Sequence, residues 1–125
     1  MKKTKFVIHD HDAKRAGHHW DLRLAYDDVL KSWAIPKARC PEKSTDKVLA
    51  IRVPDHAMDY YDFEGNITDE YGRGKVDIYD KGECTIITWK KDKINFILKG
   101  KKIKGKFWLI KLANKGASWL WLRSK

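Results

Sequence analysis

The chain has little of what several protein classes require. Only two of its 125 residues are cysteines, Cys40 and Cys84, and they form no CxxC pair. Neither a zinc knuckle nor a disulfide is therefore predicted, and we expect two free thiols. No apolar run approaches the roughly 18 residues of a membrane span, and MKKTKF leads directly into a strand pattern without a cleavable signal peptide. These absences favour a globular, cytoplasmic protein without a membrane partner.

Helical periodicity is also nearly absent. Short apolar segments between turn signals predict strands at residues 5–9, 19–26, 29–35, 47–53, 74–80, 83–90, 93–99, 105–112 and 118–123. Turn signals include Lys81-Gly82, and residues 36–46 and 55–71 are predicted as loops, the second with about one helical turn. Such strand spacing is typical of antiparallel barrels. We predict an all-β, mainly antiparallel fold: one small β-barrel domain of about eight strands over residues 1–125, with little helix.

Charge is unevenly distributed along the chain. The net charge is +10, and residues 63–125 carry 15 basic and 7 acidic side chains, against 12 and 10 in residues 1–62. Residues 90–106 contain eight lysines and a single acid, Asp92. Such a stretch is typical of proteins that bind nucleic acid, because neutralising phosphates releases counterions. The alternative is that lysine-rich turns keep a small β protein soluble. The six tryptophans are expected mainly to fill the barrel, with base stacking as the alternative.

Residues 9–26, HDHDAKRAGHHWDLRLAY, hold the richest chemistry. Four of the five histidines lie here: His9, His11, His18 and His19. In the second half, apolar residues alternate with polar ones: Trp20, Leu22 and Leu24 with His19, Asp21 and Arg23. Because successive side chains of a strand point to opposite faces, one face is predicted to carry imidazole, carboxylate and guanidinium in a row. A strand that needed only a solvated face would use Lys, Thr or Glu, so this face is a candidate site.

His11, His19 and Asp21 offer two imidazoles and one carboxylate. This set suits a divalent metal with open positions, such as Mn²⁺ or Fe²⁺, with zinc as an alternative and a solvated histidine patch as the other interpretation. Arg23 continues the same face and is a good bidentate partner for phosphate oxygens, although an ion pair with an Asp on a neighbouring strand is equally compatible. His56 lies outside the cluster and is a candidate general acid or base.

Four segments, in order, also carry a family resemblance. FVIHDHDAKRAGHHWDLRL, LKSWAIPK, VPDHAMDYYDFEG and EYGRGKV resemble the 3′-phosphoesterase domain of bacterial DNA ligase D and its stand-alone archaeal relatives. The likeness runs from Phe6 to about Asp80, with a weaker echo in FILKGKKIKGKFWLIKL and WLWLRSK. It implies a manganese-dependent enzyme on a β-barrel, which heals 3′ ends in the strand-break repair of non-homologous end joining. Such a phosphodiesterase and phosphomonoesterase removes a 3′-terminal ribonucleoside and then the 3′-phosphate, leaving a ligatable 3′-OH.

The resemblance also implies roles for individual residues. His11, His19 and Asp21 match the metal ligands, for Mn²⁺ or, alternatively, Co²⁺ or Zn²⁺. Arg23 and His56 match residues that engage the scissile phosphate, and Tyr60 matches a tyrosine of the active site, so these three are the predicted catalytic residues. His9 stands where glutamine is common and is a further candidate phosphate contact.

Three departures from the family pattern affect this transfer. The His-x5-His spacing is lengthened here, so His18 competes with His19 for the ligand role, although the HxDxR register favours His19. Pro54 stands where the family has a glutamate that contributes to activity. The segment upstream of the first motif is very short, so phosphate contacts that family members draw from it are not expected here.

The expected partners are DNA or RNA/DNA 3′ ends and a separate ligase and polymerase of end joining, and we expect a monomer. Two other classes of function remain open. In a facial-triad iron/2-oxoglutarate oxygenase, His19, Asp21 and a distal His56 would hold iron; this leaves His11 without a role, and no arginine follows His56 before Arg73. A non-catalytic nucleic-acid-binding barrel would explain the charge and the tryptophans but not the histidines.

Overall fold

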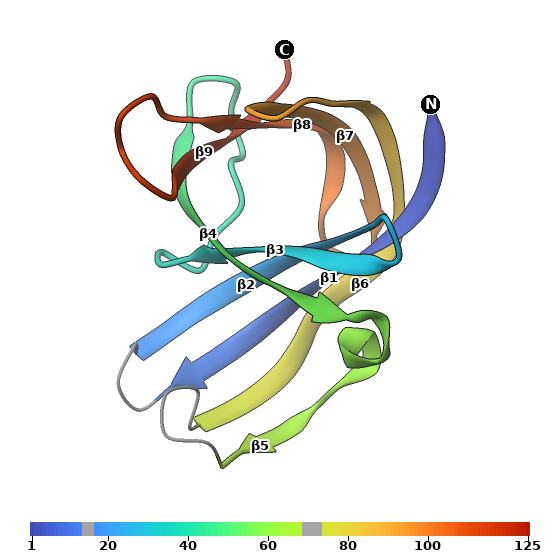
Figure 1. Cartoon of the computed structure of the whole chain (residues 1–125), viewed down its shortest axis with the longest axis vertical. Helices are drawn as coiled ribbons and strands as arrows, with labels where there is room; N and C mark the ends of the chain where they lie inside the picture. Colours follow the sequence, from blue (N-terminus) through green and yellow to red (C-terminus); the bar gives the residue numbers. More distant parts are fainter. Residues whose placement is uncertain (14–16, 69–73) are drawn as a thin grey trace.

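The computed structural model of the chain describes residues 1–13, 17–68 and 74–125 (Figure 1). Its elements are β1 (Lys2–Ala13), β2 (Gly17–Tyr26), β3 (Val29–Ile35), β4 (Lys47–Ala57), the 3₁₀ helix η1 (Met58–Asp62), β5 (Gly65–Ile67), β6 (Gly74–Trp89), β7 (Lys93–Gly100), β8 (Lys104–Lys111) and β9 (Ser118–Arg123). The strands follow the order β1-β2-β3-β4-β9-β8-β7-β6-β5, and pairing of β1 with β6 closes eight of them into a barrel. All of these pairings are antiparallel, which confirms the predicted fold.

Bulky apolar side chains fill the barrel because each strand sends alternate residues inward. The largest fully buried side chains include Trp33, Trp121, Phe6, Phe96 and Phe107. Trp20 and Trp119 are also buried, whereas Trp89 and Trp108 are half-buried, so most tryptophans belong to the core as predicted. Both cysteines are buried and free, and burial raises the pKa of Cys40 to about 11 and that of Cys84 to about 12.

The prediction of two strands at 74–80 and 83–90 was wrong, because β6 runs through both without the turn expected at Lys81-Gly82. Gly82 pairs with Gly100 of β7. A Cβ at Gly82 would lie 2.2 Å from the carbonyl oxygen of Lys99, so this glycine permits a close approach of two strands. The pairing of β6 with β1 shifts by one residue at Tyr79, a bulge of the kind that bends a strand.

The predicted loop 55–71 is more regular than expected. β4 continues to Ala57, so His56 lies on a strand; η1 is the predicted helical turn, and β5 follows it. Pro54 lies where the pairing of β4 with β3 is irregular, a position that tolerates a residue without an N–H. Glu70–Arg73 of the EYGRGKV motif and Lys14–Ala16 lie outside the described residues. No helix in the described part of the chain is long and apolar enough to cross a membrane.

The lower part of Figure 1 shows β1, β2 and β6 extending below the barrel, with η1 and the end of β4 beside them. A second, smaller hydrophobic cluster joins these parts. Val7, Ala25, Leu30 and Tyr61 form it, and Met58, Tyr60 and Ile78 pack against it. Because Val7 and Ala25 lie on the face of the sheet that points away from the barrel core, this cluster holds η1 over that outer face.

Candidate metal centre

The pairing of β1 with β2 brings the predicted ligands onto one face. His11 lies opposite His19, and His9 lies opposite Asp21. Directly opposite residues of antiparallel strands project to the same side, so these four side chains share the outer face of the sheet. Although the interval between His11 and His19 is lengthened, His11 pairs with His19, Asp12 with His18 and Ala13 with Gly17 without a register shift.

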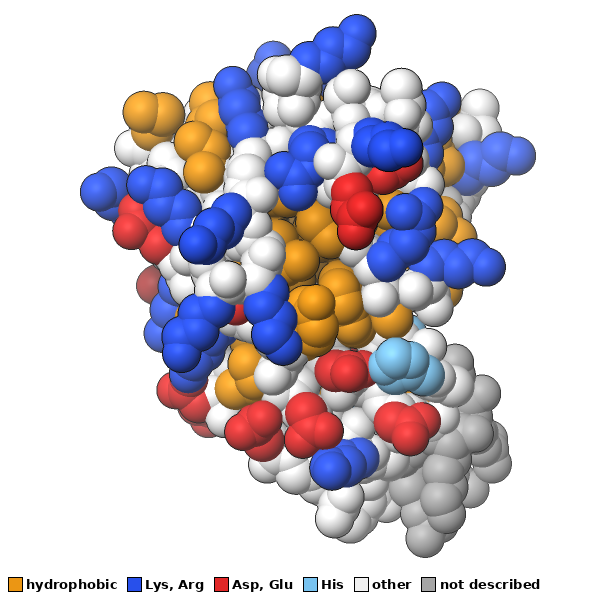
Figure 2. All heavy atoms as spheres, turned by 180° about the vertical axis from the view of Figure 1, so that it is seen from behind, with side chains coloured by type: hydrophobic (Ala, Val, Ile, Leu, Met, Phe, Trp, Pro, Cys, Tyr) orange, Lys and Arg blue, Asp and Glu red, His pale blue; other side chains and the backbone are white. Residues whose placement is uncertain are grey.

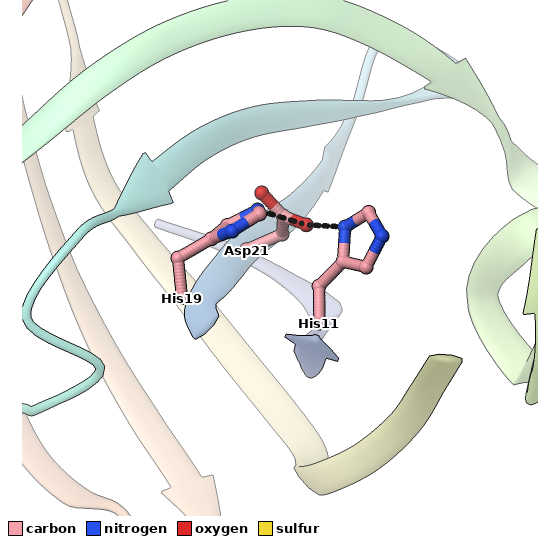
Figure 3. A group of neighbouring side chains, drawn as sticks. All are labelled: His11, His19 and Asp21. Carbon is pink, nitrogen blue, oxygen red and sulfur yellow. Dashed lines mark ion pairs between the residues drawn. The ribbon is translucent and has the colours of Figure 1, made fainter. Parts of the chain in front are cut away.

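Figure 3 shows His11 and His19 converging on the carboxylate of Asp21. His11 Nδ1 lies 3.5 Å and His19 Nε2 3.4 Å from the same oxygen, Asp21 Oδ2. One ligand atom of each residue lies within 4.8 Å of the others. His11 and Asp21 are buried, and His19 is half-buried. Two imidazole nitrogens and one carboxylate oxygen at this spacing can share one divalent cation.

The structure separates the two adjacent histidines. His18 Nε2 hydrogen-bonds Asp10 Oδ1 on the opposite face of the hairpin, and more than half of its side chain is exposed. His19 faces His11 and Asp21 instead. The geometry therefore places His19, and not His18, in the cluster.

Electrostatics keep Asp21 ionised. Burial alone would raise the pKa of this carboxyl group, but hydrogen bonds with His11 and His19 and the charge of Arg23 outweigh it and hold the pKa well below its usual range. The hydrogen bond with Asp21 in turn raises the pKa of His19. A cation can replace the protons that the imidazoles would otherwise carry, which is the usual coupling between metal binding and proton release.

Arg23 continues the outer face and is surrounded by polar groups, one of which is the Tyr60 hydroxyl, to which it donates a hydrogen bond. Its Nε donates to His9 Nδ1 and its Nη1 donates to Ser32 Oγ, both at 2.9 Å. Its Nη2 lies 3.4 Å from Asp21 Oδ2, so the ion pair considered from the sequence exists, on the same strand rather than a neighbouring one. Only 3% of Arg23 is exposed. The guanidinium is therefore held in one orientation beside the metal-ligand cluster.

His9 contacts Arg23 and is fully buried. Because its Nδ1 accepts a hydrogen bond from Arg23, we assign its proton to Nε2. Burial and the charge of Arg23 lower the pKa of His9 to about 4, so it is neutral near pH 7. The predicted phosphate contact at His9 stays a prediction; the contact that the structure shows is one that orients Arg23.

Tyr60 and His56 complete the outer face. The His56 ring stacks on Tyr60 at 4.4 Å between centroids, and Tyr60 stacks on Phe63 at 4.8 Å. The Tyr60 ring also lies 5.0 Å from the guanidinium carbon of Arg23. Burial and the charge of Arg23 lower the pKa of His56, and burial raises that of Tyr60. The end of β4 thereby brings His56, and η1 brings Tyr60, close to Arg23.

Two contributions were missed in the sequence. Ser32, which accepts from Arg23, is fully buried, and its only signal was a serine within the apolar strand VLKSWAI. Phe63 gave no signal beyond its place in the VPDHAMDYYDFEG motif. His56 does not belong to the metal-ligand group found among the described residues, whereas the oxygenase hypothesis requires it there and leaves out His11.

Comparisons with known proteins agree with the motif resemblance. Residues 9–111 match the family described as DNA Ligase D 3′-phosphoesterase domain. The chain is 38% identical over 129 residues to the multifunctional non-homologous end joining protein LigD of Pseudomonas aeruginosa, a match that covers 97% of this chain and 15% of that protein. It is 40% identical over 125 residues to the multifunctional non-homologous end joining DNA repair protein LigD of Mycobacterium tuberculosis, covering 96% and 16%. The chain thus spans about a sixth of the length of these relatives.

Proposed function

The chain belongs to the family of DNA ligase D 3′-phosphoesterase domains, and from this premise we propose that it is a Mn²⁺-dependent phosphoesterase acting on 3′ ends of DNA or RNA/DNA strands. It would remove a 3′-terminal ribonucleoside as a phosphodiesterase and the remaining 3′-phosphate as a phosphomonoesterase. The resulting 3′-OH would be a substrate for a ligase or polymerase of end joining. The convergence of His11 and His19 on Asp21, beside the buried Arg23, is the observation that carries the proposal.

The three side chains fit a divalent cation by their chemistry. Two imidazole nitrogens and one carboxylate oxygen leave coordination positions open for phosphate oxygen and water, and this borderline-to-hard set suits Mn²⁺, with Co²⁺ or Zn²⁺ as alternatives. When bound, the metal supplies Lewis-acid polarisation and neutralises charge at the scissile phosphate.

The remaining roles belong to residues of the chain itself. Arg23 binds a non-bridging phosphate oxygen, and His9 and Ser32 orient it in advance, so little reorganisation accompanies the reaction. The lowered pKa of His56 keeps its imidazole neutral near pH 7, so it can accept a proton from the attacking oxygen and then pass that proton to the leaving oxygen. Tyr60 positions the side chains of His56 and Arg23, because its ring stacks on His56 and covers the guanidinium of Arg23.

A 5′-labelled oligonucleotide with one 3′-terminal ribonucleotide tests the proposal, in Mn²⁺ and in EDTA. We expect Mn²⁺-dependent loss of one nucleoside followed by loss of the 3′-phosphate. His19→Ala should abolish both steps. The matched control is His18→Ala, which removes the adjacent, exposed imidazole and should retain turnover within about twofold, as surface substitutions generally do.

Each other outcome would contradict the proposal. Turnover in EDTA, or undiminished turnover of His19→Ala, would exclude the metal centre. A mobility shift without cleavage would favour the non-catalytic barrel, and turnover that requires 2-oxoglutarate would favour the oxygenase.

A further inference from the structure

A pocket of about 390 Å³ lies on the other side of the β1–β2 hairpin from the metal-ligand cluster. Its lining includes two aromatic side chains, Trp20 and Tyr79, together with four basic ones and one acidic one: Arg39, Lys102, Lys104, Arg123 and Glu42. Trp20 pairs with Asp10 and packs in the barrel core, so the pocket opens at the mouth of the barrel. Figure 2 shows a hollow of hydrophobic side chains in the middle of the rear face, with Lys and Arg side chains above and beside it and Asp and Glu side chains along its lower border.

Tyr79 is the central feature of this pocket. Trp20 backs its ring, with centroids 4.4 Å apart and planes inclined by 34°. The ammonium of Lys102 lies over the Tyr79 ring, 4.3 Å from its centroid. Tyr79 is half-buried, whereas only 6% of Trp20 is exposed. A supported aromatic ring among basic side chains is the combination that binds successive bases and phosphates of single-stranded nucleic acids.

A second hollow, of about 220 Å³, shares Tyr79 and Lys102 with this pocket and is also lined by Lys81, Lys101 and one acidic residue. That residue, Asp80, directs its carboxylate to four backbone N–H groups. It lies along a stretch of β6 where neighbours are missing on one edge. β5 pairs with residues 74–76 and β7 pairs with residues from Gly82 onward, so residues 77–81 have no strand partner on this edge in the described part of the chain.

The open edge of β6 at residues 77–81 lies next to η1, which in turn contacts Arg23 beside the metal-ligand cluster. The Lys81 Nζ lies 2.9 Å from Asp62 Oδ1 and 5.6 Å from the ring centroid of Tyr61, both in η1. Tyr60, which precedes Tyr61 in η1, lies over the guanidinium of Arg23. Basic and aromatic side chains therefore continue from the metal-ligand cluster, around the edge of β6, to the pocket at the barrel mouth. Two carboxylates lie among them, and each has a partner: Asp62 pairs with Lys81, and Glu64 accepts from the backbone N–H of Ile78.

We propose that these two hollows bind the single strand that leads to the 3′ end, with one base stacked on Tyr79 and neighbouring phosphates on Lys102 and Lys104. The proposal rests on the proposed function, since it places the 3′ end of that strand at the metal-ligand cluster. A base stacking on Tyr79 takes the place of the Lys102 ammonium, which turns to a phosphate. Because the path passes from one face of a sheet to the other, it suits a flexible single strand better than a duplex, whose persistence length is about 150 base pairs.

The lysines of residues 90–106 therefore fall into two groups, one inside and one outside the proposed path. Lys101, Lys102 and Lys104 line the two hollows, whereas Lys91 lies with Lys111 around a separate hollow at the far end of β6. Lys91 and Lys111 therefore provide a control for Lys102 and Lys104, since removing either pair changes the net charge by the same amount.

Fluorescence anisotropy with a 5′-labelled, 3′-OH single strand of about 12 nucleotides, in EDTA, tests the binding directly. Tyr79→Ala should raise Kd about 5- to 150-fold, because base–aromatic stacking contributes about 1–3 kcal/mol, whereas Tyr79→Phe should bind like the wild type. Lys102→Ala/Lys104→Ala should lower the slope of log Kd against log salt concentration by about 1.4. Lys91→Ala/Lys111→Ala should leave Kd and slope close to those of the wild type.

The proposal fails if the Lys102/Lys104 and Lys91/Lys111 variants weaken binding equally, or if folded Tyr79→Ala binds like the wild type. Tyr79→Ala loses the contact between Tyr79 and Trp20 and could unfold for that reason. In that case Tyr79→Phe and the two lysine double variants, which keep this contact, still test the proposal. A kinetic measurement separates this failure from that of the proposed function. Mn²⁺-dependent turnover with equal KM in all variants would refute the strand path alone, and the expected pattern of Kd without any turnover would refute the phosphoesterase activity alone.

Discussion

Two buried carboxylates, Asp21 and Asp80, have partners of different kinds. Their exposed fractions are nearly the same, 5% and 4%. Asp21 lies on the outer face of the sheet, among two imidazoles and a guanidinium. Asp80 lies on the barrel side and accepts hydrogen bonds from four backbone N–H groups at 2.7–3.0 Å, those of Lys81, Lys101, Lys102 and Ile103.

The partners indicate which carboxylate is the candidate for chemistry. Each oxygen of Asp80 accepts two backbone hydrogen bonds, and backbone N–H groups neither titrate nor bind metals. Asp80 therefore fixes the turn between β7 and β8. The partners of Asp21 are side chains whose nitrogens can bind a cation or lose a proton. Burial of a charge alone does not identify a functional site; the chemistry of the groups that compensate the charge does.

The largest effect is expected for Asp21→Asn. Turnover with Mn²⁺ should fall more than about 100-fold, because loss of even an outer hydrogen-bond partner of a metal ligand costs about 10- to 100-fold. Phosphate release from a 3′-phosphorylated oligonucleotide, with folding checked by near-ultraviolet circular dichroism, measures it. Asp10→Asn is the control, since Asp10 lies on the opposite face with His18. Wild-type kcat in Asp21→Asn would place the chemistry elsewhere.

Asp80→Ala should act on stability. Several backbone N–H groups would lose their acceptor, so we expect the free energy of unfolding to fall by about 3 kcal/mol or more. Urea titration followed by tryptophan fluorescence measures this change. Asp77→Ala, an exposed position on the same strand with a surface ion pair to Lys75, should change stability by no more than about 0.5 kcal/mol. Equal effects of the two substitutions would show that the Asp80 contacts stabilise nothing.

The pH dependence of stability tests the environment of His9 on the outer face. The pKa of His9 is lowered from 6.5 to about 4 in the folded chain, so between these values the unfolded chain binds a proton that the folded chain does not. The contribution of His9 to stability is therefore complete above pH 6.5 and is lost as the pH falls, by at most about 3 kcal/mol near pH 4.

His9→Gln, without metal, should abolish that part of the pH dependence. The raised pKa of His19 acts in both proteins, and Asp21 titrates below its usual 3.8, outside this window. The difference in unfolding free energy between pH 7 and pH 4 measures the effect. Identical pH profiles for the two proteins would show that His9 takes up its proton equally well in the folded state.

The smallest effect is expected at Ser32, an uncharged partner of Arg23. Ser32→Ala removes one hydrogen bond to the guanidinium, which is worth about 0.5–1.5 kcal/mol, so kcat should fall about 2- to 10-fold. Ser32→Thr keeps the hydroxyl and should restore much of kcat, which separates positioning of Arg23 from a packing effect. A kcat that is unchanged in Ser32→Ala would mean that His9 and Asp21 suffice to hold Arg23.

The sequence by itself determined the strand that carries the candidate site. Alternation of Leu22 and Leu24 with Asp21 and Arg23 is a local, two-residue pattern, so it predicts which side chains share a face without knowledge of the fold. It also placed His19 with Asp21 on that face. It did not show that both faces are buried, because the cover over the outer face is η1, which lies more than 30 residues further along the chain.

Only the tertiary structure decided how these residues are combined. The β1–β2 register places His11 opposite His19. Arg23 contacts Ser32 on β3 and Tyr60 in η1. Gly82, predicted at a turn, lies inside β6 because its missing Cβ allows β7 to approach. Such contacts join residues distant in sequence, and closure of the barrel, rather than any local preference, sets their distances. The different surroundings of Asp21 and Asp80 are a consequence of that closure.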